Sequence, residues 1–321
     1  MTNYLAFDQK TKNLIHSRIT FVAKQLGLQK EDVLKHFGHL NKDKLKISEP
    51  THLERFIDHT NLHSHATSKD IKHLCGEAID FNFYSVCVNS SRVPEAVDNL
   101  RGTDVKIASV VGFFLGATST SAKVNETEFA INSGATEIDM VINVGKLKDL
   151  DYKYVLNDIK SIVDCGASVK VILETALLDE IEIIDASILS VLADAHFVKT
   201  STGFSTGGAK SEDIRLMKLV VGEEREVKAS GGIRDFNSAA EMIKNGATRI
   251  GASKGVQIVD QERNPELRKP KIVEKKPKEQ KKTETKQETK DESDMKDILY
   301  MLGFGATGGF IAGHILTKWK K

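Results

Sequence analysis

The chain has 321 residues, of which 40% are hydrophobic, so it is long enough to bury at least one full core. Its 46 basic and 45 acidic side chains leave a net charge of +1, which disfavours nucleic acid or another polyanion as a partner. The three cysteines, Cys75, Cys87 and Cys165, form no CxxC pair, so we expect no disulfide framework, no metal site and a reducing compartment.

Residues 1–50 are predicted to form a helical extension. Apolar residues recur at helical spacing from Leu14 to Leu26, and a second short helix through Val33 and Phe37 is expected to end at Gly38. A packing accessory or a helical lid is a simpler role for this extension than catalysis. The start of the chain lacks an apolar stretch before a small-residue cleavage site, so we expect a cytoplasmic protein.

From about residue 53 to residue 259, short β-rich stretches alternate with helical patterns. The predicted strands are "FIDHT", "YSVCVN", "KIASVVGF", "EIDMVIN", "VKVILET", "FVKTSTG", "VKASGG" and "RIGAS". The predicted helices between them include 68–81, 121–133, 152–165, 180–193, 211–221 and 236–245. Strands that are each followed by a helix are typical of the α/β class of (β/α)8 TIM barrels, which we assign to residues 51–262.

The composition changes again after the barrel. Residues 263–297 are rich in Lys, Glu, Thr and Gln, and we expect a disordered linker there. Residues 298–321 begin with an uncharged stretch, Ile298 to Leu316, close to the length of about 20 residues that crosses a bilayer, and they end in a basic tail with Trp319. This segment is expected to contact a membrane as a C-terminal anchor. A helix that docks on a partner or lies in the membrane surface is the alternative.

The alternation of side chains along each strand sorts them into barrel-facing and helix-facing sets. In "EIDMVIN" the isoleucines and the methionine face the helices, which leaves Glu137 and Asp139 inside. The same reasoning turns Lys170, Lys199 and Lys228 toward the interior.

Buried charges of this kind form either a structural ion-pair network or a catalytic group. Lys199 and Lys228 come late in strands six and seven, near the end of the barrel where active sites of this fold lie. A lysine amine is nucleophilic only when neutral, and burial beside another ammonium favours the neutral form. Schiff-base chemistry on Lys199, with Lys228 lowering its pKa, is therefore the hypothesis.

Glycine-rich turns follow the last three predicted strands, in "STGF", "SGGIR" and "GASKG". Loops at this position of the fold commonly hold a phosphate on backbone N–H groups. Arg234 is placed either to contact the same anion or to form a surface ion pair. The residues that we assign to the anion site are Gly203, Gly231, Gly232, Gly251 and Ser253.

From "IDHTNL" to "RIGASKGVQIV", and above all in "VKTSTGF" and "KASGGIR", the chain resembles the deoxyribose-phosphate aldolases, which are class I aldolases. The resemblance implies reversible cleavage of 2-deoxy-D-ribose 5-phosphate, a small sugar phosphate, to D-glyceraldehyde 3-phosphate and acetaldehyde without a cofactor. It places the Schiff-base lysine on Lys199, the second lysine on Lys228 and the proton-relay aspartate on Asp139. It also implies substrate contacts from Asp58, Thr60 and Cys87. Alternation along strand six turns Ser201 toward the interior, and we assign it as a further substrate contact.

Three points stay open at this stage. Cys87 fits a small buried core residue as well as an aldehyde pocket. Lys254 stands where many relatives have a serine, and it either adds a cation to the phosphate site or faces solvent. Two other functions also remain: a different Schiff-base aldolase or lyase of sugar phosphates, and a retained barrel that acts in membrane or partner binding. A homodimer is compatible with the sequence, which does not determine the oligomeric state.

Overall fold

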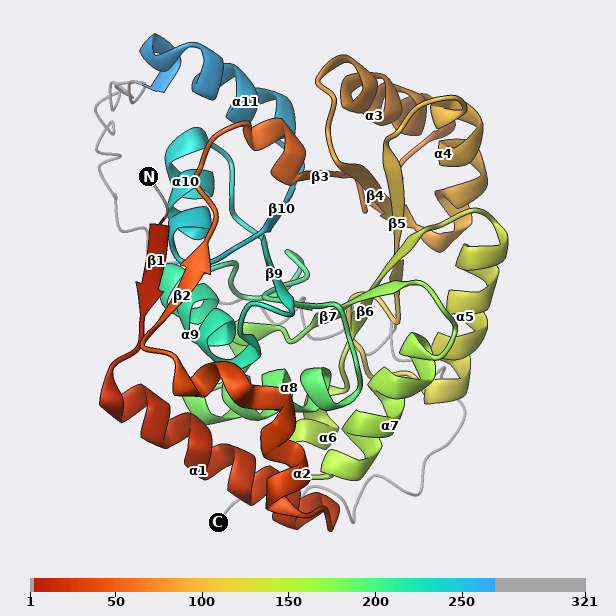
Figure 1. The fold of residues 1–321 in the computed structure, drawn as a ribbon. Helices are drawn as coiled ribbons and strands as arrows, with labels where there is room; N and C mark the ends of the chain where they lie inside the picture. Colours follow the sequence, from red (N-terminus) through yellow and green to blue (C-terminus); the bar gives the residue numbers. More distant parts are fainter. Residues whose placement is uncertain (1–2, 269–321) are drawn as a thin grey trace, which may run out of the picture. The chain divides into compact units, whose positions relative to one another are not determined.

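The computed structural model of the protein describes residues 3–268, in which eight parallel strands close into a barrel (Figure 1). The strands are β3 Ile57–Thr60, β4 Ser85–Asn89, β5 Lys106–Val111, β6 Glu137–Val141, β7 Ser168–Ile172, β8 Phe197–Lys199, β9 Glu226–Ser230 and β10 Arg249–Ala252. Each strand pairs with the next in chain order, and β10 pairs with β3 to close the ring. The predicted barrel is confirmed.

Helices surround the barrel and connect its strands (Figure 1). They are α3 Ser68–Asp80, α4 Val93–Leu100, α5 Thr120–Asn132, α6 Val144–Lys148, α7 Tyr152–Val163, α8 Glu180–Leu192, α9 Ser211–Val221, α10 Phe236–Lys244 and α11 Gly255–Arg263. Short 3-10 turns occupy Leu53–Phe56, Ser90–Arg92, Thr175–Leu177 and Pro265–Arg268. Capping boxes at Thr67, Asp179 and Asp235 satisfy free N–H groups where α3, α8 and α10 begin.

The strands separate an apolar layer from a charged interior. On β6, Ile138 and Met140 are fully buried in the main hydrophobic cluster between strands and helices. Asp139, between them, is equally buried but bonds to lysines inside the barrel. The period-two prediction for this strand is therefore confirmed.

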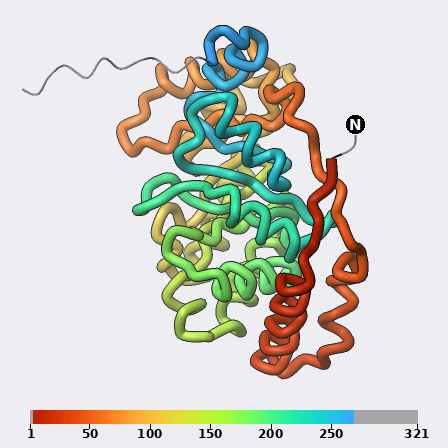
Figure 2. Tube along the Cα trace, turned by 90° about the vertical axis from the view of Figure 1, so that its left-hand side faces the viewer, coloured from red at the N-terminus to blue at the C-terminus, as the bar shows by residue number. Residues whose placement is uncertain are grey.

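The N-terminal extension differs from the prediction in two respects: the second helical segment continues past Gly38 as a 3-10 turn, and the extension is not wholly helical. It contains α1 Gln9–Leu26, α2 Lys30–Leu34 and a 3-10 turn, Lys35–Asn41, but it begins and ends with strands that pair antiparallel, β1 Asn3–Ala6 and β2 Lys44–Ile47. The expectation of a wholly helical extension was wrong. The alternation of exposed and buried residues in "KLKI" spans only one short strand, which is too little to reveal a strand in the sequence. Figure 2 shows the extension, in red and orange, along one side of the barrel, where α1 contacts α7 and α8.

A partly buried ion pair attaches the extension to the barrel. Arg18 on α1 donates to both carboxylate oxygens of Asp185 on α8, at 2.9 and 2.6 Å, and the Tyr152 hydroxyl bonds to the same carboxylate. Asp185 is 1% exposed, so it depends on these donors for its charge.

Arg18→Met is expected to lower the free energy of unfolding by about 2 kcal/mol, because it leaves the buried Asp185 carboxylate without a cation. Urea denaturation measures the change. Lys10→Met, an exposed site on the same helix, is the control and is expected to change the free energy by no more than about 0.5 kcal/mol. Equal stabilities for the two variants would show that this ion pair does not hold the extension in place.

The described residues run past the predicted barrel boundary at residue 262. Arg268 donates to the backbone oxygens of Gln261 and Glu262 and lies 3.7 Å from the centre of the Phe236 ring. The rest of the predicted linker and the predicted anchor, Ile298 to Leu316, lie outside the described residues. Within residues 3–268, no helix combines the length and the apolar character needed to cross a bilayer.

Candidate active site

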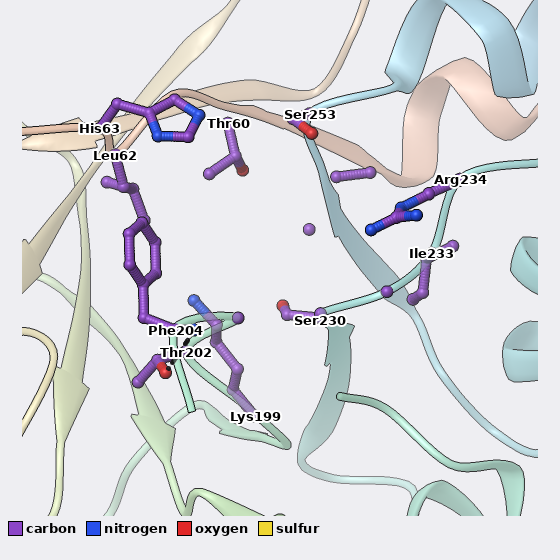
Figure 3. A pocket seen from close by; sticks show the side chains of 15 residues that line it. Thr60, Leu62, His63, Lys199, Thr202, Phe204, Ser230, Ile233, Arg234 and Ser253 are labelled. Carbon is purple, nitrogen blue, oxygen red and sulfur yellow. Dashed lines mark hydrogen bonds between the residues drawn. The ribbon is translucent and has the colours of Figure 1, made fainter. Parts of the chain in front are cut away.

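Lys199, the last residue of β8, lies at the base of a cavity of about 310 Å³ (Figure 3). Its side chain rises between Phe204 and Ser230, and the residue is 3% exposed. The amine donates a hydrogen bond of 2.7 Å to Asp139 Oδ2, below the cavity. A buried amine therefore faces a space large enough for a small molecule.

Below Lys199, a chain of charged side chains fills the barrel interior. Asp139 also accepts from Lys228 at 2.7 Å and from Lys170 at 2.9 Å. Further ion pairs extend the chain: Lys228 with Asp58 at 2.5 Å, Arg249 with Asp58 at 2.9 Å and Glu137 at 3.1 Å, and Lys170 with Glu137 at 2.6 Å. We call these seven residues, Asp58, Glu137, Asp139, Lys170, Lys199, Lys228 and Arg249, the charged column.

The charged column contains one more basic group than acidic groups. Burial lowers the pKa of Lys199, and the neighbouring Lys228 ammonium lowers it further, against the opposing effect of Asp139. At Lys228 burial also acts to lower the pKa, but Asp139 and Asp58 together outweigh it and raise the pKa. Lys199 is therefore the lysine of the column that most readily becomes neutral, as a nucleophile requires.

Asp139 is the ionised carboxylate at the centre of the column. Burial alone would raise its pKa, but Lys170, Lys199 and Lys228 hold that pKa well below the ordinary value. Because Oδ2 bonds both Lys199 and Lys228, it connects the two amines by short hydrogen bonds. The geometry thus combines the two hypotheses about buried charges: the column is a paired network, and its top member faces a cavity.

The predicted anion-site residues lie together on the cavity wall. Those that line it with Lys199 are Gly203, Gly231, Gly232, Gly251, Ser253 and also Arg234 (Figure 3). Thr60, predicted as another substrate contact, lines the same cavity. Gly203, Gly231 and Gly232 have φ of 83°, 87° and 79°, a conformation that favours glycine. At Gly251 a side chain would collide with Ser230 Oγ at 2.5 Å and with Lys228 Cε at 3.0 Å.

Other predicted contacts lie elsewhere. Asp58 is absent from the cavity wall and lies in the charged column, where Ser85 also donates to it. Cys87 is fully buried in an apolar cluster with Leu62, and burial raises its pKa to about 11. Ser201 is fully buried, and its hydroxyl has no hydrogen-bond partner among the described residues. Lys254 lines an adjacent cavity rather than this one.

Two features of the site were missed from the sequence. Arg249 enters the interior from the start of β10, where alternation from Gly251 would have placed it inside. The second feature is an apolar wall, formed by Leu62 and Phe204 on the side of the cavity opposite Arg234 (Figure 3). The Phe204 ring packs against Phe113 with the ring centroids 5.2 Å apart, and no sequence motif signals that contact.

No group of three or more His, Cys, Asp or Glu side chains in residues 3–268 is arranged to hold a metal ion.

Comparisons with known proteins point to one family. The profile of the DeoC/LacD family aldolases matches residues 55–261. Deoxyribose-phosphate aldolase of Aciduliprofundum boonei is 55% identical over 65% of this chain and 96% of its own length, and that of Thermotoga petrophila is 58% identical over 63% and 83%. The solved deoxyribose phosphate aldolase of Aeropyrum pernix, a tetramer, is 30% identical with a TM-score of 0.63, over 76% of this chain and 97% of that one.

Proposed function

The chain belongs to the DeoC/LacD family of aldolases, and we propose on that premise how its side chains carry out the reaction. The enzyme is a class I aldolase that reversibly cleaves 2-deoxy-D-ribose 5-phosphate to D-glyceraldehyde 3-phosphate and acetaldehyde. The observation that carries the assignment of roles is the buried Lys199 amine, with its lowered pKa, at the base of the cavity.

In the proposed mechanism, the neutral Lys199 amine attacks the C1 aldehyde of the open-chain sugar, and loss of water gives an iminium. Loss of the proton from the C3 hydroxyl breaks the C2–C3 bond. The electron pair of that bond moves into the iminium and forms an enamine, while glyceraldehyde 3-phosphate leaves. A proton then adds to C2, and water hydrolyses the new iminium to release acetaldehyde and free Lys199.

Asp139 and Lys228 support these steps from below the cavity. Lys228 favours the neutral form of Lys199, and Asp139 Oδ2 orients the amine for attack. Because its pKa is so low, Asp139 holds a proton only in passing, while Lys228 stays protonated beside it. This arrangement makes Asp139 a proton relay on the Lys199 side rather than a store of the reaction's proton.

We propose that the phosphate binds at the wall formed by Gly203, Gly232, Ser253 and Arg234. Their backbone N–H groups and the guanidinium suit an anion, and the apolar wall opposite does not.

Deoxyribose without its phosphate is therefore expected to be a poor substrate, with kcat/KM lower by about 10³-fold, because several charge-assisted hydrogen bonds are lost. Steady-state kinetics with both sugars measure the ratio. Arg234→Leu should raise KM for the phosphorylated sugar only. Lys254→Leu, in the adjacent cavity, should leave KM unchanged for both sugars. Equal kcat/KM for the two sugars in the unaltered enzyme would show that no anion site contributes to substrate binding.

The activity itself is tested by a coupled assay for glyceraldehyde 3-phosphate released from deoxyribose 5-phosphate. A panel of other sugar phosphates separates this enzyme from other Schiff-base aldolases and lyases. A barrel retained only as a scaffold would release no product from any of them. The cytoplasmic location, the homodimer and the membrane attachment stay predictions from the sequence.

A further inference from the structure

Glu174, just after β7, has an unusual backbone and an unusual environment. Its φ and ψ are 58° and 60°, a left-handed conformation that costs free energy for a residue with a side chain. Backbone bonds to β8 and its extension flank it: Leu173 N donates to Lys199 O and Thr175 N to Thr200 O, both at 2.9 Å. The neighbouring strand therefore holds the turn at Glu174 in place.

Glu174 is 3% exposed, and its carboxylate bonds to a single residue. Its Oε2 accepts from the Thr202 hydroxyl at 2.5 Å and from the Thr202 backbone N–H at 3.2 Å. Its Oε1 has no hydrogen-bond partner, and no ion pair involves Glu174 within residues 3–268. A carboxylate buried in this way costs free energy. Because Glu174 makes no ion pair with the charged column, that column does not explain why this carboxylate is buried.

Thr202 connects this carboxylate to the cavity. Its hydroxyl, which donates to Glu174, also accepts from the backbone N–H of Phe204 at 3.1 Å. Gly203, between them, lines the cavity and belongs to the proposed phosphate site. Phe204 forms the apolar wall (Figure 3). Holding the Thr202 hydroxyl in place therefore also holds the backbone of Gly203 and Phe204, the two residues after it that line the cavity.

We propose that Glu174 is a positioning residue, whose carboxylate holds the Thr202 hydroxyl so that Gly203 and Phe204 stand correctly above Lys199. The inference rests on the proposed function, because it concerns how that substrate is held. Glu174 lines no part of the cavity itself, so it acts through Thr202 and not by touching the sugar.

The test compares Thr202→Val, which removes the hydroxyl, with Thr202→Ser, which keeps it, and adds Glu174→Gln. Thr202→Val is expected to raise KM for deoxyribose 5-phosphate by about tenfold, the effect of a lost bond to a charged group, while kcat changes much less. Thr202→Ser should restore KM to within about twofold, and Glu174→Gln should fall between them, because an amide oxygen is a weaker acceptor. Glu182→Gln is the control, because that carboxylate bonds to Lys148 and Asp179, away from the cavity.

A second readout separates positioning from general damage and from failure of the proposed function. Reduction with borohydride in the presence of acetaldehyde traps the Schiff base on Lys199 without any need for the phosphate site. In all variants the adduct should form at the same acetaldehyde concentration as in the unaltered enzyme. An unchanged KM in Thr202→Val, or a fall in kcat and trapping that Thr202→Ser does not restore, would overturn the role of Glu174. An unaltered enzyme that does not cleave deoxyribose 5-phosphate would instead overturn the proposed function.

Discussion

Lys199→Met should reduce cleavage of deoxyribose 5-phosphate by about 10⁴-fold or more, because no other amine lines the cavity within the described residues. The variant is expected to fold, since Asp139 keeps its bonds to Lys170 and Lys228 after the change. A coupled assay measures the loss. In the unaltered enzyme, borohydride reduction with acetaldehyde followed by peptide mass mapping should place the adduct on Lys199.

Lys123→Met is the matched control. Lys123 is another fully buried lysine, paired with Asp158 at 2.5 Å between α5 and α7, outside the cavity. Its loss should lower stability but leave the site of the adduct unchanged. An adduct on Lys228 or Lys170 in the unaltered enzyme would contradict the assignment of the nucleophile.

The second large effect is expected at Lys228. In Lys228→Met, Asp139 loses one cation and Lys199 loses the neighbouring ammonium, so the pKa of Lys199 rises. Because only the neutral amine attacks, each unit of that rise removes about tenfold of the active form below the pKa, and we expect kcat at neutral pH to fall by about 10²-fold. The buried Asp58 keeps Arg249 and Ser85 as partners, so the barrel should still close.

The sign of the pH dependence is what identifies the role of Lys228. Lys199 is neutral above its pKa, so activity rises with pH through that value. Raising the pKa moves the rising limb to higher pH, and Lys228→Met should therefore recover part of its activity in alkaline buffer. A pH–rate profile measures this shift. A profile that is merely scaled down at every pH would mean that Lys228 does not tune Lys199.

The barrel and the three central charged residues of its active site were predictable because both depend on short-range patterns in the sequence. Alternation along β6, β8 and β9 is enough to place Asp139, Lys199 and Lys228 inside, whichever residues they meet there. Which interior charges meet is a different matter, because it depends on the stagger of strands around the barrel. Asp58 and Arg249, 191 positions apart in the chain, form a bond that no local pattern reports.

The other differences between prediction and structure depend on tertiary contacts in the same way. Glutamate is not a residue that signals a left-handed backbone, so nothing at Glu174 suggests the turn there. Cys87 was expected near the substrate from the resemblance alone, but it is fully buried in an apolar cluster with Leu62 and Val110. Strand β1 has only four residues, too few for its period to stand out.

The charged column also limits how this protein can change over evolutionary time. Removing one partner of a buried ion pair typically costs about 3–5 kcal/mol, while a whole domain is stable by only about 5–15 kcal/mol. Each carboxylate of the column bonds at least two basic groups, so the effects of substitutions within it should not be additive. A related protein with an apolar barrel interior would therefore need several of these residues to be replaced together. A single replacement would destabilise the protein and be selected against before a second, compensating replacement could occur.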